Sequence, residues 1–177
     1  MHRPYTRSRV VVAVSVLLAA LPVTPAAGQG SAEAALKTYL LTMPNIRKMV
    51  KAYENLDAAL RANPALKNKA AKGEDATSLD NLIAKYEKEP AIRQSYSSAG
   101  ITVREGVLTQ FALLSAGLNA YVVKQGGKPE STPAAAANLK LYQQNEKEID
   151  QITAKLKTLA SWQDEEGDDD SDESDQE

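Results

Sequence analysis

The sequence contains no cysteine and a single histidine, His2, and only 5% of its 177 residues are aromatic. His2 lies in an N-terminal segment that, as argued below, is expected to be removed, so the mature protein should lack both residue types. It would then have neither the Ser-His-Asp or Cys-His sets of nucleophilic enzymes nor the usual His and Cys ligands of zinc. The lack of cysteine also excludes a disulfide scaffold and a bacterial lipoprotein anchor. We therefore expect no cofactor and no metal site.

The first 28 residues have the layout of a secretory signal peptide. Arg3, Arg7 and Arg9 form a basic start without any acid, and an apolar stretch of 12 residues follows at 10–21. A stable membrane span needs about 20 apolar residues, so a cleaved signal is favoured over an anchor. Cleavage after Gly28, with Ala26 at the −3 position, would make Gln29 the new N-terminus; cleavage after Ala26 or Ala27 is the alternative. We expect export by the Sec route to a bacterial periplasm or the extracellular space.

The last 14 residues, 164–177, include ten Asp or Glu and no apolar side chain. Such a block repels itself and buries nothing, so it is predicted to be a disordered, solvated tail. It does not match an EF-hand calcium loop, because position 6 of the best alignment is Glu173 where glycine is needed. The domain boundaries predicted from the sequence are thus a signal peptide at 1–28, a helical domain at 29–163 and the tail.

The net charge of −2 conceals a division between the domain and the tail. Residues 29–163 hold 18 Lys or Arg and 13 Asp or Glu, which gives a domain charge of +5. The basic residues are spread along the chain rather than grouped with aromatic side chains, so nucleic-acid binding is not expected.

The domain is predicted to be all-α, a small bundle of four to six helices. Apolar residues in 43–62 recur at helical spacing, with Thr42 as the N-cap and Asn63-Pro64 at the end. Shorter apolar stretches at 31–41, near 79–86, and from Pro90 to Gly100 complete the first half of the domain. A polar connection at about 64–77 separates the helix at 43–62 from the stretch near 79–86.

The strongest boundary signal is at Gly100 to Glu105. Glycine suits a left-handed helix C-cap, and Thr102-Val103-Arg104-Glu105 is a capping box. The helix that it opens, 102–125, is apolar over more than half its circumference and is expected to be central. Gly106 and Gly117 lie three turns apart on one face, which indicates a close helix crossing or a chance placement.

A last helix is predicted from Thr132, with Pro133 at its first position, to about Leu159. Its seam has heptad-like spacing: Tyr142, Asn145, Ile149, Ile152, Leu156 and Leu159. Asn145 in this seam either fixes register or lies near a solvated end of a monomeric bundle.

Two sets of residues could support a function. Glu105 could act as a general acid or base in a hydrolase-type enzyme if it were buried, although the capping box already explains its presence. A tyrosine is predicted on the apolar stripe of each of five helices: Tyr53, Tyr86, Tyr96, Tyr121 and Tyr142. If these rings converge they could line a pocket for a small aromatic or amphiphilic ligand; otherwise they pack at the rim of the core.

These observations favour an exported, non-enzymatic helical protein that binds an unknown partner. The alternative is a carrier or sensor with a small ligand in the tyrosine-lined pocket. An enzyme that uses Glu105 is the third hypothesis. The partner is therefore expected to be a protein or a small ligand rather than a nucleic acid or, after signal cleavage, a membrane.

Overall fold

Two long helices, α2 (Met43–Ala62) and α6 (Val103–Lys124), form the centre of the fold. A computed structural model describes residues 31–66 and 77–160, so the predicted signal peptide and acidic tail lie outside the described residues. The other elements within those ranges are α1 (Ala32–Leu36), the 3-10 turn η1 (Pro64–Leu66), α4 (Leu79–Lys88), α5 (Pro90–Ser98), α7 (Pro133–Gln144) and α8 (Glu146–Ala160). The described residues contain no strand, which confirms the all-α prediction. They form seven α-helices, where the sequence predicted four to six.

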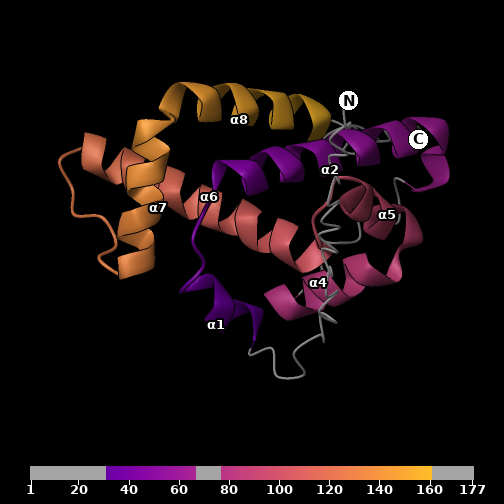
Figure 1. Cartoon of the computed structure of the whole chain (residues 1–177), viewed down its shortest axis with the longest axis horizontal. Helices are drawn as coiled ribbons and strands as arrows, with labels where there is room; N and C mark the ends of the chain where they lie inside the picture. Colours follow the sequence, from indigo (N-terminus) through magenta and orange to yellow (C-terminus); the bar gives the residue numbers. More distant parts are fainter. Residues whose placement is uncertain (1–30, 67–76, 161–177) are drawn as a thin grey trace, which may run out of the picture.

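The helices enclose two adjoining cores that share α2 and α6. Figure 1 shows α6 crossing the molecule, with α2 and α8 along one side, α1, α4 and α5 near its start, and α7 across its far half. The first core joins α1, the second half of α2, α4 and α5 to the start of α6. The second core joins the first half of α2 and α8 to the middle of α6. Because α6 passes through both cores, it is apolar around most of its surface.

The helix boundaries follow the local signals in the sequence. Thr42 and Thr132 cap α2 and α7 by accepting hydrogen bonds from backbone amides three residues on. The capping box of α6 is confirmed, since the Glu105 amide donates to Thr102 Oγ1 at 3.1 Å and the Thr102 amide donates to Glu105 Oε2 at 3.3 Å. Gly100 has a φ of 74°, the left-handed conformation expected of a glycine after a helix.

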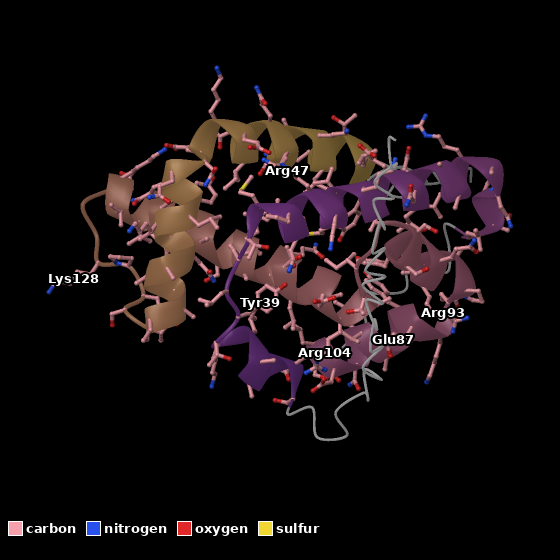
Figure 2. The ribbon with its side chains drawn as sticks, in the orientation of Figure 1. Tyr39, Arg47, Glu87, Arg93, Arg104 and Lys128 are labelled. Atoms are coloured by element: carbon pink, nitrogen blue, oxygen red, sulfur yellow. The ribbon has the colours of Figure 1, made fainter. Side chains whose placement is uncertain are left out.

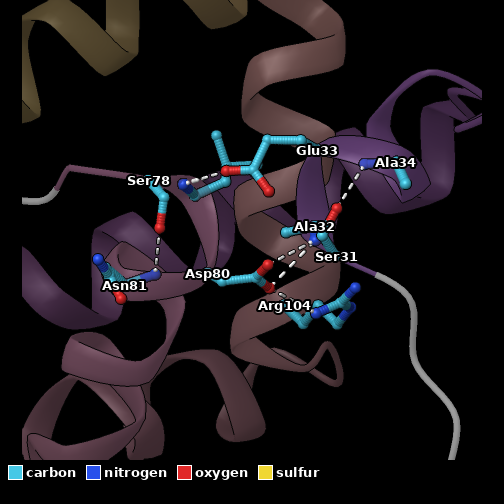
Figure 3. A network of polar contacts seen from close by, with 9 residues as sticks. Ser31, Ala32, Glu33, Ala34, Ser78, Asp80, Asn81 and Arg104 are labelled. Atoms are coloured by element: carbon cyan, nitrogen blue, oxygen red, sulfur yellow. Dashed lines mark hydrogen bonds and ion pairs between the residues drawn. The ribbon is translucent and has the colours of Figure 1, made fainter.

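Reciprocal capping between α1 and α4 was not anticipated from the sequence. The Ala32 amide at the start of α1 donates to both carboxylate oxygens of Asp80 on α4, at 3.1 and 3.0 Å. In return, the Leu79 amide at the start of α4 donates to Glu33 of α1 at 2.8 Å. Arg104 of α6 pairs with Asp80 at 3.4 Å and connects this network to the central helix (Figure 3). Each acid thus satisfies amides at the start of the other helix.

Asn138 of α7 fixes the link between α1 and α2. Its buried side-chain oxygen accepts from the Leu41 amide at 2.8 Å, and its side-chain nitrogen donates to the Tyr39 carbonyl at 2.9 Å. The Tyr39 side chain lies between α1 and α6 (Figure 2), where its hydroxyl bonds to that of Thr109 at 2.8 Å. The link is therefore attached to α6 and α7 by polar contacts.

The segment predicted as one helix, 133–159, is two helices that meet at Asn145. The Asn145 side chain donates to the Leu141 carbonyl at 2.9 Å and ends α7 by local hydrogen bonding. α8 starts at the next residue and turns toward α2, where Ile149 is fully buried. A heptad-like spacing continues through such a break, so the periodicity did not reveal it.

One helix of the described residues, α6, is long and apolar enough to cross a membrane. Half of its apolar stretch is buried within the fold. The apolar composition of α6 is accounted for by its contribution of side chains to both cores.

Candidate functional site

An apolar groove of about 340 Å³ lies between α6 and α8. It is open to solvent, and apolar surface predominates in its lining. Met49 of α2 and Tyr142 of α7 are among its lining residues. The remaining lining residues come from α6 and α8: Gln110, Leu113, Leu114, Gly117, Leu118, Thr153 and Leu156.

The groove exists because α8 is attached to α2 and leaves part of α6 uncovered. Arg47 of α2 lies at the boundary with α8 (Figure 2) and donates to Glu148 at 2.8 Å. A second pair joins Lys155 to Glu54. Hydrogen bonds from their partners lower the pKa values of Glu148 and Glu54. These exposed pairs contribute little stability. The side of α8 that faces α2 is the one that carries Ile149, which is fully buried in the second core.

The uncovered face of α6 carries a stripe of large apolar side chains. Leu114, Leu118 and Tyr121 are spaced i, i+4 and i+7, so they lie on one side of the helix. They are 59%, 59% and 62% exposed, whereas the large apolar residues on the opposite sides of this helix, Val103, Val107, Leu108 and Leu113, are buried. A row of exposed leucines beside an apolar groove indicates an interaction site.

Three of the five tyrosines singled out from the sequence lie together where the two cores adjoin, with Tyr96 and Tyr86 in the first core and Tyr53 against the second. The rings of Tyr53 and Tyr96 meet edge to face, with centroids 6.4 Å apart. Burial raises the pKa values of both hydroxyls, and the nearby Tyr86 adds to this effect. Burial also raises the pKa of Tyr86. All three phenols are therefore held in their neutral form.

The other two tyrosines lie apart from this cluster. Tyr142 lines the groove, where burial first and then Asp150 and Glu146 raise its pKa. Tyr121 is largely exposed at the end of the leucine stripe. The Tyr53 hydroxyl donates to Gln110 Oε1 at 2.7 Å, and so connects the buried cluster to the rim of the groove.

Glu105 is exposed and engaged in the capping box that starts α6. The polar positions that follow it along α6 also have structural partners. Thr109 donates to the Glu105 carbonyl at 2.7 Å, and Asn119 accepts from the Glu130 amide at 2.8 Å. This stripe therefore connects α6 to the neighbouring links. The described ranges contain no group of three or more His, Cys, Asp or Glu placed to hold a metal ion.

Sequence analysis did not single out Leu114, Leu118 or Leu156 as site residues. Their spacing predicted apolar helix faces, and such faces are normally buried against a neighbour. Leu114 and Leu118 differ because no other helix of the described residues packs over them. They are left uncovered because α8 packs against α2. No signal in the sequence marks this course of α8, because it depends on the break at Asn145 and on the burial of Ile149 against α2.

Comparison of the chain with protein-family models, with curated proteins and with solved structures finds no match.

Proposed function

We propose that the protein is an exported, non-enzymatic binding module whose α6–α8 groove takes the apolar face of a helix from a partner protein. The observation that carries this proposal is the exposed stripe of Leu114, Leu118 and Tyr121 beside an apolar groove. The stripe follows the axis of α6, and the lining residues of α8 run beside it.

Such a groove suits helix-in-groove recognition. An amphipathic helix presents apolar side chains at i, i+4 and i+7, the same spacing as the stripe on α6. The Tyr142 ring packs over Gly117, since a Cβ there would be 3.4 Å from Cε2 of that ring, and so it forms part of the apolar floor of the groove. The partner's apolar side chains would pack on Leu114 and Leu118, which are both exposed.

A small amphiphilic ligand is the second candidate. The groove volume of about 340 Å³ lies at the lower end of the range of ligand pockets. Polar groups of Gln110, Thr153 and Tyr142 stand among the apolar residues and could bind the head of such a ligand. The open form of the groove favours the protein partner, because a small ligand would stay largely in water.

Site-specific photo-crosslinking in the exporting cell tests the protein-binding proposal. A photoreactive phenylalanine analogue replaces Leu118, and in a matched control it replaces Leu40, which is 57% exposed away from the groove. We expect a discrete adduct of protein size from position 118 and none from position 40. Adducts from neither position, or equally from both, would contradict the proposal.

Native mass spectrometry of the purified protein tests the second candidate. A bound small molecule would appear as a constant mass increment, and Leu118→Lys would remove it while Leu40→Lys would not. The absence of any increment, together with a crosslink at position 118, would eliminate the small-ligand candidate.

Export is part of the proposal, and the processed N-terminus tests it. Cleavage between Ala26 and Gly30 would leave the whole described fold in the mature chain, including the Ala32 amide that donates to Asp80. The intact mass of protein recovered from the periplasm or medium should correspond to such a cut. A mass that still includes Met1 would contradict processing.

A further inference from the structure

We propose that the α6–α8 groove is covered, in the absence of a partner, by the Trp162 segment (residues 161–163) of the same chain. The inference concerns the groove assigned above, but it does not depend on the existence of a partner. On this proposal, the segment that follows α8 competes with a partner for the groove.

The position of α8 makes this occupant available. Leu156 lines the groove, and α8 ends four residues later at Ala160. These four residues carry the chain about 6 Å past Leu156 along the helix axis. Trp162 is two residues farther, and two extended residues span up to about 7 Å. A chain that reverses direction after Ala160 therefore returns Trp162 to the level of Leu156.

The chemistry of the segment matches the groove. Trp162 is the only tryptophan of the chain, and an indole brings about 150–250 Å² of surface to bury. The exposed sides of Leu114 and Leu118 offer an apolar surface for the ring. Its N–H can donate to a side-chain oxygen of Thr153 or Gln110, two polar residues that line the groove. From Asp164 onward the chain is mostly acidic, so its chemical match with the apolar groove ends at Gln163.

A second copy of the chain is a weaker occupant than this segment. A short connection holds a group near its site at an effective concentration in the millimolar range. The Trp162 segment is joined directly to α8, which forms one wall of the groove. At micromolar protein the intramolecular contact should therefore prevail. A partner helix must displace the ring before it can reach the leucines.

Intrinsic fluorescence of the full mature chain tests the proposal, because Trp162 is the only indole and reports its own environment. We expect its emission to be blue-shifted, and its quenching by acrylamide reduced, relative to the same protein in denaturant. Leu118→Lys should shift the emission to that of a water-exposed indole. Leu40→Lys, at a leucine of matched exposure outside the groove, should leave the emission unchanged. Circular dichroism would verify that both variants keep their helices.

Three results would overturn the proposal. The first is water-like emission of the unmodified chain. The second is a blue shift that survives both Leu114→Lys and Leu118→Lys, which would place the indole elsewhere. The third is a blue shift lost on dilution, which would identify a second copy as the partner of the ring.

The proposal that Trp162 covers the groove and the proposal that the groove binds a partner can be rejected independently. If the ring covers the groove, Trp162→Ala should increase the yield of the crosslinked adduct at position 118. An adduct whose yield is unchanged by Trp162→Ala would support binding and reject the cover. Groove-dependent fluorescence without any adduct would support the cover and reject the partner.

Discussion

Two glycines of α6 face tyrosine rings at different distances, and alanine should therefore have opposite effects at the two positions. A Cβ at Gly106 would lie 2.1 Å from Cε1 of Tyr96, a ring that is 2% exposed. A Cβ at Gly117 would lie 3.4 Å from Cε2 of Tyr142, which is an ordinary contact. The sequence placed both glycines on one face and indicated a close crossing. Each glycine in fact meets a ring from a different helix.

Gly106→Ala should destabilise the protein and Gly117→Ala should stabilise it. Alanine improves an interior helix position by about 1 kcal/mol over glycine. At Gly106 this gain should be outweighed by overpacking, which costs about 1–3 kcal/mol in a dense core. At Gly117 nothing opposes the gain. Urea unfolding of the two variants measures the signs, and shifts in the same direction would refute the difference in packing.

The buried tyrosines predict how stability depends on alkaline pH. Burial raises the pKa values of Tyr53 and Tyr96 above their ordinary value of 10.0. The folded protein therefore retains phenolic protons that the unfolded chain releases. Their contribution to stability is complete below pH 10 and is lost as the pH rises above it.

Tyr96→Phe should flatten this alkaline loss, because the variant has one buried phenol fewer to ionise. Tyr121→Phe, at a largely exposed ring, serves as the control and should keep the slope of the parent. The free energy of unfolding, measured by denaturant at a series of pH values on both sides of 10, gives the slopes. Equal slopes in all three proteins would mean that these phenols do not determine the alkaline limit.

At the scale of the element, local signals predicted where helices begin and end better than they predicted what the helices contact. Thr42, Thr102 and Thr132 each cap the expected helix, because a cap depends only on a few neighbouring residues. The break at Asn145 was missed, since α7 and α8 share one apolar spacing although they pack on different helices. The short α1 was indistinct for another reason: its amide partner, Asp80, lies 48 residues away.

The groove could not be predicted from the sequence, because it depends on which helices contact one another. The sequence showed that α6 is apolar on most sides, but it could not show which side the other helices leave open. Tyr53, Tyr86 and Tyr96 do come together, as a common apolar stripe allows. Tyr121 faces solvent because α8 follows α2 instead of covering the end of α6.

The capping box of α6 provides a test at this scale. Thr102→Ala removes the oxygen that accepts from the Glu105 amide and should lower the free energy of unfolding by about 0.5–2 kcal/mol. Ser97→Ala, at an exposed hydroxyl near the end of α5, is the control and should have a smaller effect. Denaturant midpoints at constant slope report both changes. A midpoint unmoved by Thr102→Ala would show that this cap does not stabilise α6.

At the scale of the whole molecule, charge is divided between a domain of +5 and a tail with ten acids. Within the described residues much of the charge is arranged in exposed pairs, such as Arg47 with Glu148 and Lys124 with Glu146. Each such pair has no net charge. The electrostatic field of the domain at longer range is therefore set by its excess of five positive charges. The tail is then the nearest polyanion for that field, and it is covalently attached.

Deletion of residues 164–177, which retains Trp162, should expose this field without weakening the fold. Unpaired surface charges farther apart than about 8–10 Å are largely screened at physiological salt, so the attraction of the tail is weak and diffuse. The free energy of unfolding should therefore stay nearly constant, whereas elution from a heparin column should require more salt for the truncated chain. The difference should fall as salt is added to the binding assay, because both contacts are electrostatic. Identical elution of the two chains would mean that the tail does not compete for the basic surface and acts only in solvation.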